Sequence, residues 1–276
     1  MYTLNCKGRL LILDKPVVMG VLNITPDSFY SGSRTETNDA ILVKAEQMLN
    51  EGAAILDIGG QSTRPGSKRL SAEDELQRVL PAIEILKNHF PNCFLSVDTY
   101  HAKVAKEAVQ AGADIVNDIS GGEMDTEMIT TVATLKVPFI TMHMQGTPGT
   151  MQENPTYKHV TGEVLDHFIK KTEQCKAAGI IDVIIDPGFG FGKTIAHNFQ
   201  LLRELEVFQI LKYPLLVGLS RKSTIYKTLG ITAEEALNGT TVLNTIALQK
   251  GAAILRVHDV KEAKEAITLV QSVYTK

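Results

Sequence analysis

Eight apolar runs recur along the chain, and a polar or glycine-rich tail follows each of them. The runs span 17–22, 54–59, 94–98, 114–118, 137–142, 182–186, 214–218 and 252–257. Most tails lead into a segment with the 3.6-residue apolar period of a helix. Strands that alternate with helices predict a parallel sheet. Eight such strands in a chain of this length predict that the sheet closes into a barrel. We therefore expect an α/β fold, a TIM (β/α)8 barrel.

The segments outside the runs complete this picture. Between the first two runs, Ile41, Ala45, Met48 and Leu49 fall on one face of a predicted helix. Residues 3–14 predict a short N-terminal hairpin, which we expect to cover the floor of the barrel. No linker or low-complexity tract divides the chain, so residues 1–276 are expected to form a single domain.

Composition and charge exclude several classes of partner. The 276 residues are 44% hydrophobic and 21% charged, with a formal net charge of −3, which gives no electrostatic reason to expect nucleic acid or a membrane. No apolar stretch approaches the roughly 20 residues that span a bilayer, and the N-terminus lacks a signal-peptide core. Cys6, Cys93 and Cys175 are far apart and have no metal-type spacing. These features predict reduced thiols in a cytoplasmic protein.

A barrel gathers the eight tails at one mouth, where active sites of this fold lie. The polar groups in or after the runs are Asn23, Asp57, Asp98, Asn117, His143, Asp186, Lys222, Arg256 and His258. A lone carboxylate here is equally explained as a helix N-cap. Asp98, Asn117 and Asp186 together favour a flat, donor-rich ligand, because a carboxylate accepts two parallel N–H bonds from a guanidine-like edge. A pterin or guanine ring presents such an edge.

The basic tails predict an anion site. Lys222 follows the seventh run, and Arg256 and His258 end the eighth, where this fold commonly binds phosphate. His258 precedes the last predicted helix, whose N-terminus favours an anion. Any one of these groups is equally explained as a solvated surface charge. Strand alternation, however, places Arg256 and His258 on the same side.

The segment DPGFGFGK (186–193) lacks the spacing of a dinucleotide fingerprint. We expect its glycines to let the backbone approach a flat ligand, with Phe189 or Phe191 as a wall. Core packing explains Phe191 equally well. Met142 and Met144 are interpreted as packing residues.

Taken together, these tails closely resemble the dihydropteroate synthases, folate-pathway transferases with a pterin-binding barrel. The matching motifs, in family order, are VMGVLNITPDSF, DIGGQSTRPG, SVDT, VNDIS, MHMQG, DPGFGFGK, LVGLSRKS and RVHDV. The resemblance implies that hydroxymethyl-dihydropterin diphosphate is joined to para-aminobenzoate, giving dihydropteroate and pyrophosphate. It also implies a Mg²⁺ cofactor, small-molecule substrates, and a homodimer formed through outer helices. The family is a target of sulfonamides, and the altered first loop leaves the sensitivity of this chain open.

The resemblance assigns roles to the matched residues. Residues implied to hold the pterin are Asp98, Asn117, Asp186 and Lys222 at its edges and Arg256 on its face. Residues implied to bind the diphosphate are Asn23, Arg256 and His258, with Asn23 also touching Mg²⁺. Thr63 and Arg64 lie on the loop that closes over the site. Residues implied to shape the aminobenzoate pocket are Phe29, Pro65, Phe191 and Ser223, where a helix N-terminus would favour the carboxylate.

The chemistry implied by the resemblance needs no nucleophilic side chain. Mg²⁺, Arg256 and His258 would stabilise the departing diphosphate, and Asp98 the pterin cation that its departure leaves. The aryl amine then attacks. The catalytic residues are therefore expected to be Asp98, Lys222, Arg256 and His258. Two departures from the family pattern, Gln61 for Glu and Ser31 for Asp, each remove a carboxylate near the loops.

Three alternatives share parts of this pattern. A pterin barrel that transfers a methyl group from methyltetrahydrofolate would share the Asp and Asn pocket but would have little need for the diphosphate cluster. A non-catalytic pterin-binding paralogue would be expected to lose Lys222, Arg64 or Asn23, and the sequence retains all three. A phosphosugar isomerase or aldolase would need a base or a Schiff-base lysine deep in the barrel. Lys193 and Lys222 are the lysines near strand ends, and both lie in matched motifs.

Overall fold

The computed structural model describes residues 1–24, 34–61, 69–151 and 153–274. All eight predicted runs form strands in it. In chain order these are β3 (Val17–Asn23), β4 (Ala53–Gly59), β5 (Phe94–Asp98), β6 (Ile115–Asp118), β7 (Phe139–Met142), β8 (Val183–Asp186), β9 (Leu216–Val217) and β10 (Ile254–Val257). Two further strands, β1 (Tyr2–Cys6) and β2 (Arg9–Leu13), pair antiparallel as the predicted N-terminal hairpin.

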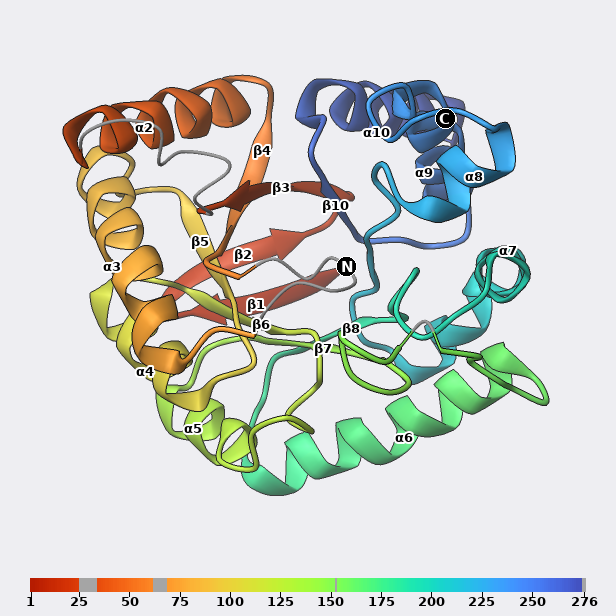
Figure 1. Cartoon of the computed structure of the whole chain (residues 1–276), viewed down its shortest axis with the longest axis horizontal. Coiled ribbons are helices and arrows are strands. Elements are labelled where there is room, and N and C mark those ends of the chain that lie inside the picture. The colour runs from red at the N-terminus through yellow and green to blue at the C-terminus, as the bar shows by residue number, and fades with distance from the viewer. Residues whose placement is uncertain (25–33, 62–68, 152, 275–276) are drawn as a thin grey trace.

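The eight strands form one parallel sheet in the order β8-β7-β6-β5-β4-β3-β10-β9. A parallel bridge between Ile185 and Leu215 joins the two outer strands. There the Ile185 amide donates to the Pro214 carbonyl over 3.0 Å. This bridge brings the sheet close to full closure, and the predicted TIM barrel is confirmed (Figure 1).

Helices surround the strands and cover their outer faces (Figure 1). They are α2 (Arg34–Asn50), α3 (Ala72–His89), α4 (Ala102–Ala111), α5 (Met128–Leu135), α6 (Val160–Ala178), α7 (Ile195–Arg203), the 3-10 helix η1 (Leu205–Leu211), α8 (Ser223–Leu229), α9 (Leu237–Gln249) and α10 (Val260–Tyr274). Ile41, Ala45 and Met48 of α2 are buried in the apolar layer between helices and barrel, as their spacing predicted. None of the helices in the described ranges is long and apolar enough to cross a membrane.

The floor of the barrel is filled by side chains and covered by the hairpin. Leu4, Cys6, Leu11 and Leu13 of the hairpin belong to the same buried cluster as inward-facing residues of seven strands. Those residues are Met19, Ile55, Ile115, Ile140, Ile184, Leu216 and Ile254. Figure 1 shows the hairpin crossing the centre of the ring. The prediction for residues 3–14 is therefore confirmed, and the space left for chemistry is at the opposite end.

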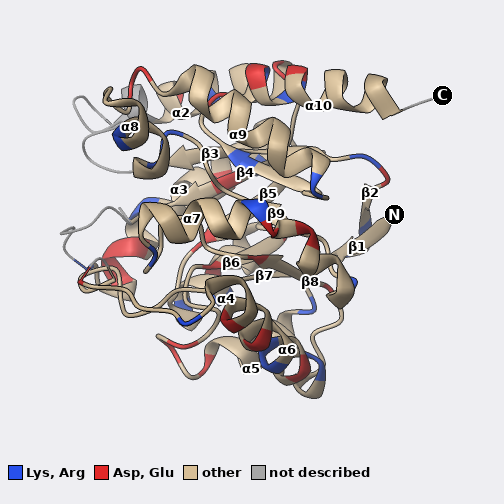
Figure 2. Ribbon diagram, turned by 90° about the vertical axis from the view of Figure 1, so that its right-hand side faces the viewer, with Lys and Arg blue, Asp and Glu red and all other residues tan. Residues whose placement is uncertain are grey.

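Polar contacts fix the hairpin to the barrel. The Asn5 main-chain N–H donates to the carboxylate of Asp182, just before β8, and the Arg9 guanidinium pairs with Asp114 at 2.8 Å. Elsewhere on the surface, acidic and basic positions are interspersed along helices such as α6 and α10 (Figure 2). This mixture agrees with the small formal net charge of −3.

Candidate active site

The register of the sheet aligns the predicted polar tails. Asn23 pairs with Gly59, Gly59 with Asp98, and Asp98 with Asn117, so one row crosses β3, β4, β5 and β6. A Cβ atom added at Gly59 would lie 3.4 Å from Asn23 Oδ1 and 3.6 Å from Asp98 Cβ. Because glycine has no side chain there, the groups on the two flanking strands approach each other across β4 at the barrel mouth.

Arg256 lies between two carboxylates inside the mouth. Its Nε donates to Asp57 Oδ2 over 2.7 Å, and a terminal nitrogen donates to Asp98 Oδ2 over 2.6 Å. Asn117 Nδ2 also donates to Asp57 Oδ2, over 3.0 Å. Asp57 is fully buried, so these charge-assisted bonds hold the guanidinium in one place.

Burial and these charges shift the acidity of the cluster. Burial raises the pKa of Asp98, which Arg256 opposes and Asp57 reinforces. Burial disfavours the charged form of Arg256, but the Asp57 and Asp98 carboxylates outweigh it and raise the pKa of the guanidinium. The arginine therefore stays charged, while Asp98 is held where it can accept hydrogen bonds or share a proton.

Asp186 and Lys222 form the second half of the mouth. Asp186 ends β8, and its Oδ1 accepts from the Gly188 amide over 2.8 Å. Burial raises the pKa of Asp186, and Lys222 opposes this shift. Lys222 donates to the Phe189 carbonyl, and burial lowers the pKa of its ammonium to about 8. A carboxylate acceptor and an ammonium donor thus face the same space.

One aromatic side chain, Phe191, lies beside Lys222 at this end of the barrel. Phe191 is half-buried and packs against a cluster formed by Tyr100, Ile119 and Met142, and the Lys222 ammonium lies 4.8 Å from the centre of its ring. Phe189, by contrast, is completely buried in the main core. Of the two phenylalanines proposed as a wall, Phe191 therefore lies at the mouth and Phe189 is a packing residue.

The glycines after Asp186 do something other than we expected. Gly188 and Gly192 have φ of +72° and +61°, and a Cβ there would lie 2.0 Å from the His143 carbonyl oxygen and 2.4 Å from that of Gln145. They allow the loop after β8 to pack against the loop after β7. For these two glycines the expectation that they open the backbone to a flat ligand is wrong, because protein backbone fills the space beside them. Gly190 instead lies beside the Lys222 side chain, so for this glycine the expectation stays a prediction.

His258 follows β10 on the same side as Arg256. Its main-chain N–H donates to Ser220 Oγ over 3.2 Å, and its Nδ1 lies 3.0 Å from the same oxygen. His258 is exposed at the rim of the mouth, and partial desolvation by the surrounding protein together with the nearby Arg256 charge lowers the pKa of its imidazole to about 4. Ser223, the first residue of α8, directly follows Lys222 and is half-buried.

Several predicted residues lie outside the described ranges. These are Phe29 and Ser31 after β3, and Thr63, Arg64 and Pro65 after β4. The residues beside the second of these segments are described. Gln61 Oε1 accepts from the Leu70 main-chain N–H over 3.2 Å. The glutamine found where the family has Glu thus supplies a neutral oxygen that joins the two ends of the segment.

The structure adds two residues to those predicted for the site. Asp57 was recognised as a polar position within an apolar run but given no role, although it holds both Arg256 and Asn117. Lys193 was weighed only as a candidate Schiff-base lysine. It is 2% exposed, and its Nζ lies within hydrogen-bonding distance of the carbonyl oxygens of residues 143, 188 and 191. A lysine held by three main-chain oxygens fixes the loop after β8.

The described residues include no group of three or more His, Cys, Asp or Glu side chains placed to hold a metal ion. Mg²⁺, however, usually keeps several waters and takes few protein oxygens together with substrate phosphates. The amide oxygen of Asn23, half-buried at the end of β3, fits such a partial site. A metal brought with a diphosphate is compatible with this donor set.

Comparison with known proteins gives concordant matches. The family model described as pterin binding enzyme matches residues 19–258. The dihydropteroate synthase of Haemophilus influenzae is 43% identical over 271 residues, which cover 98% of both chains. The Yersinia pestis dihydropteroate synthase structure with a sulfonamide drug has a TM-score of 0.92 at 42% identity, covering 99% of each chain. The Xanthomonas albilineans enzyme with 4-aminobenzoic acid has a TM-score of 0.92 at 41% identity, covering 99% of this chain and 98% of the other.

Proposed function

The chain belongs to the family of pterin binding enzymes, and from this premise we propose that it is a transferase that catalyses the dihydropteroate synthase reaction. It joins hydroxymethyl-dihydropterin diphosphate to para-aminobenzoate and releases pyrophosphate. The observation that supports this most strongly is Arg256, fixed between Asp57 and Asp98 beside Asn117. Such a cluster offers carboxylate acceptors, amide groups and a flat cation within one pocket.

The pterin is recognised through both its edges and its face. Asp186 accepts from the amino and ring N–H groups of the pyrimidine edge, and Lys222 donates to the ring carbonyl oxygen. Asn117 and Asp98 bond the remaining ring nitrogens, while Arg256 lies against the face of the ring. Asp57 accepts hydrogen bonds from both Arg256 and Asn117, and so fixes their side chains in position for this contact.

The diphosphate binds nearer the rim. Arg256 and His258 donate to its oxygens, and the Asn23 amide oxygen helps to hold Mg²⁺, which supplies positive charge to the leaving group when bound. Neutral His258 donates through a ring N–H. These residues stabilise the negative charge that grows as the bond between the pterin methylene and the diphosphate oxygen breaks.

The bonding changes then balance without a nucleophilic side chain. The electron pair of the broken C–O bond leaves with pyrophosphate, and the methylene becomes electron-poor. Asp98 stabilises the positive charge shared by the pterin ring. The amine nitrogen of para-aminobenzoate donates its lone pair to the methylene carbon, and the proton that it loses passes to solvent or to pyrophosphate.

The aminobenzoate ring is expected to lie against Phe191, with its carboxylate near Ser223 and the start of α8. Phe29 and Pro65 are assigned to the same pocket by resemblance, and Thr63 and Arg64 to the loop above it. The Xanthomonas albilineans relative, solved with 4-aminobenzoic acid, supports a binding site for this substrate.

Pyrophosphate release from synthetic hydroxymethyl-dihydropterin diphosphate tests the proposal, with para-aminobenzoate and Mg²⁺ present or withheld. We expect Mg²⁺-dependent release with dihydropteroate formed, and at least a ~100-fold loss in Asp98→Asn. Asp182→Asn is the matched control, because the same change is made at the barrel floor. Tight pterin binding without turnover would instead identify a binding protein or a methyltransferase. Pyrophosphate release without the amine would support the cation pathway, and its absence would count against that pathway.

We also propose a homodimer formed through outer helices. Val242 on α9 and Leu269 and Val273 on α10 expose 50%, 68% and 75% of their surfaces, and burial against a second copy would remove that apolar surface from water. Light scattering should give twice the 30.2 kDa chain mass, and a monomer at micromolar concentration would contradict this.

A cytoplasmic location is proposed as well. Cys6, Cys93 and Cys175 are all free and buried, as suits a reducing compartment. Fractionation of cells that express the chain would place it with cytoplasmic markers, and recovery with a membrane or secreted fraction would contradict the proposal.

A further inference from the structure

Ser220, just after β9, makes two contacts with the same histidine. Its Oγ accepts from the His258 main-chain N–H over 3.2 Å and lies 3.0 Å from His258 Nδ1. Ser220 is 5% exposed, so its hydroxyl is largely removed from water. A buried hydroxyl whose proton has no acceptor is costly, and the proton therefore needs a partner inside the protein.

The chemistry of the hydroxyl selects one arrangement of protons. A serine hydroxyl has one proton to donate and two lone pairs. With one lone pair taken by the His258 amide, the acceptor that the described residues place within reach of the proton is His258 Nδ1. If Nδ1 accepts, the ring proton of a neutral histidine must be on Nε2. The lowered pKa of His258 favours this neutral form in the absence of ligand.

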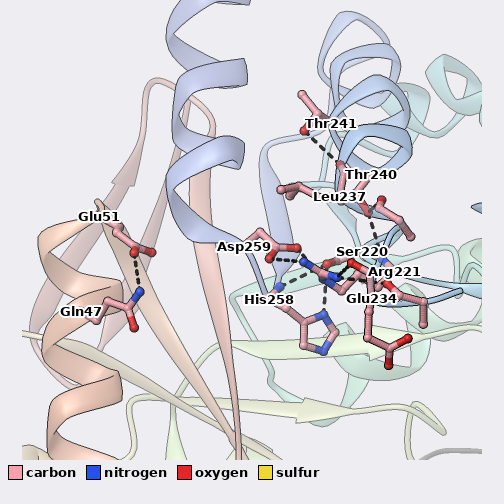
Figure 3. Close-up of polar contacts among 12 residues, drawn as sticks. Gln47, Glu51, Ser220, Arg221, Glu234, Leu237, Thr240, Thr241, His258 and Asp259 are labelled. Atoms are coloured by element: carbon pink, nitrogen blue, oxygen red, sulfur yellow. Dashed lines mark hydrogen bonds and ion pairs between the residues drawn. The ribbon is translucent and has the colours of Figure 1, made fainter.

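An ion pair holds the serine in place. Arg221, the next residue, has a left-handed φ of +54°, a conformation uncommon outside glycine. Its guanidinium bonds both oxygens of Asp259, at 2.9 and 2.8 Å, and donates to the main-chain carbonyls of Ala233 and Glu234. Figure 3 shows this ion pair beside the Ser220–His258 contact, with the imidazole pointing away from it. Since Asp259 follows His258, the same pair fixes both chain segments.

We propose that Ser220 is a positioning residue that fixes the tautomer of His258, so that Nε2–H is presented to the leaving diphosphate. This inference rests on the proposed function for the identity of the anion, but the tautomer itself is a property of the free protein. A histidine set in this way donates one oriented hydrogen bond to the growing charge and needs no prior protonation.

Nitrogen NMR of the free protein, labelled with ¹⁵N-histidine, tests the tautomer directly. The His258 resonances are assigned by their loss in His258→Gln. We expect a pyridine-like Nδ1 and a pyrrole-like Nε2 in the wild type. In Ser220→Ala we expect the two nitrogens to move toward averaged shifts. A pyrrole-like Nδ1 in the wild type, or an unchanged spectrum in Ser220→Ala, would overturn the proposal.

Two variants of Ser220 with side chains of similar shape separate the effect of the hydroxyl from that of side-chain packing. Ser220→Thr keeps the hydroxyl and Ser220→Val removes it, while both side chains have nearly the same volume. We expect pyrophosphate affinity, measured by calorimetry with Mg²⁺, to fall about 3- to 10-fold from the threonine to the valine variant, as for loss of one hydrogen bond. Ser272→Ala, on the far part of α10, should match the wild type. Equal affinity in the pair would refute the role.

The two proposals fail separately. If the chain lacked synthase activity while the tautomer shift and the Thr–Val difference persisted, the proposed function would fall and the anion site would stand. If activity were normal and the tautomer were Nδ1–H, only the role of Ser220 would be lost.

Discussion

Glu75 near the start of α3 gives a quantitative test of the electrostatics beside the barrel mouth. Its side chain is 1% exposed, and its Oε2 accepts from Thr99 Oγ1 over 3.0 Å. Its other oxygen, Oε1, has no hydrogen-bond partner in the part of the chain that the structure describes. Burial raises the pKa of this carboxyl from 4.5 to about 8, because an ionised group here would be poorly solvated.

The sign of the effect on stability follows from proton binding. The folded state binds the Glu75 proton more tightly than the unfolded state, so this group favours folding below pH 4.5 and loses that contribution as pH rises through 8. The gap between the two pKa values corresponds to about 5 kcal/mol. Glu75→Gln keeps the shape of the side chain and cannot ionise. We therefore expect the variant to gain stability relative to the wild type as pH rises.

Urea unfolding at pH 5, 7 and 9 measures this difference. The free energy of unfolding of Glu75→Gln minus that of the wild type should increase by roughly 4 kcal/mol between pH 5 and pH 9. Taking the difference cancels the titration of the other groups. Glu84→Gln, an exposed change on the same helix, should show almost no trend. A difference for Glu75→Gln that stays constant across pH would refute the reasoning.

Three further predictions follow from the site. Gly188→Ala should destabilise the fold by more than ~3 kcal/mol in urea unfolding, because its Cβ would meet a main-chain oxygen at 2.0 Å. Gly179→Ala, which has positive φ but open space around it, should cost only about 1 kcal/mol, and equal losses would contradict the clash. Asp57→Asn should lower kcat/KM at least ~10-fold with the fold retained, because Arg256 loses one of its two carboxylates, and unchanged kinetics would remove Asp57 from the site. Removal of Mg²⁺ with EDTA should abolish turnover, and Asn23→Ala should raise the Mg²⁺ concentration for half-maximal rate about 10-fold, whereas full activity in EDTA would exclude the metal.

The architecture was predictable because it depends on patterns local to the sequence. Each strand is a continuous apolar run, as strands buried on both faces are expected to be, and all eight predicted runs lie in the barrel. The hairpin was equally predictable, since residues 3–14 form two short strand-like segments on either side of a Lys7-Gly8 turn. Both turn residues have positive φ in the structure. Polar groups at the ends of such runs then had to meet at one mouth.

Contacts between loops were not predictable in the same way. Nothing in the segment 186–193 indicates that Gly188 and Gly192 face the loop after β7, because the residues they meet, His143 and Gln145, lie more than 40 positions earlier. The Arg221–Asp259 pair joins residues 38 positions apart, and neither residue differs in type from a surface charge. Asp57 could have been found, since a carboxylate inside an apolar run needs a buried partner.

The closed floor restricts how molecules reach and leave the site. Since the hairpin blocks one end of the barrel, substrates and products enter and leave through the mouth alone, and the pocket is closed at its inner end. The molecule that contacts Asn117 and Asp186 sits deepest, so it must enter before any partner that binds nearer the rim. Steady-state kinetics should then show a compulsory order of addition, with the pterin first. Para-aminobenzoate in large excess would occupy the rim early and slow the reaction by obstructing the entrance.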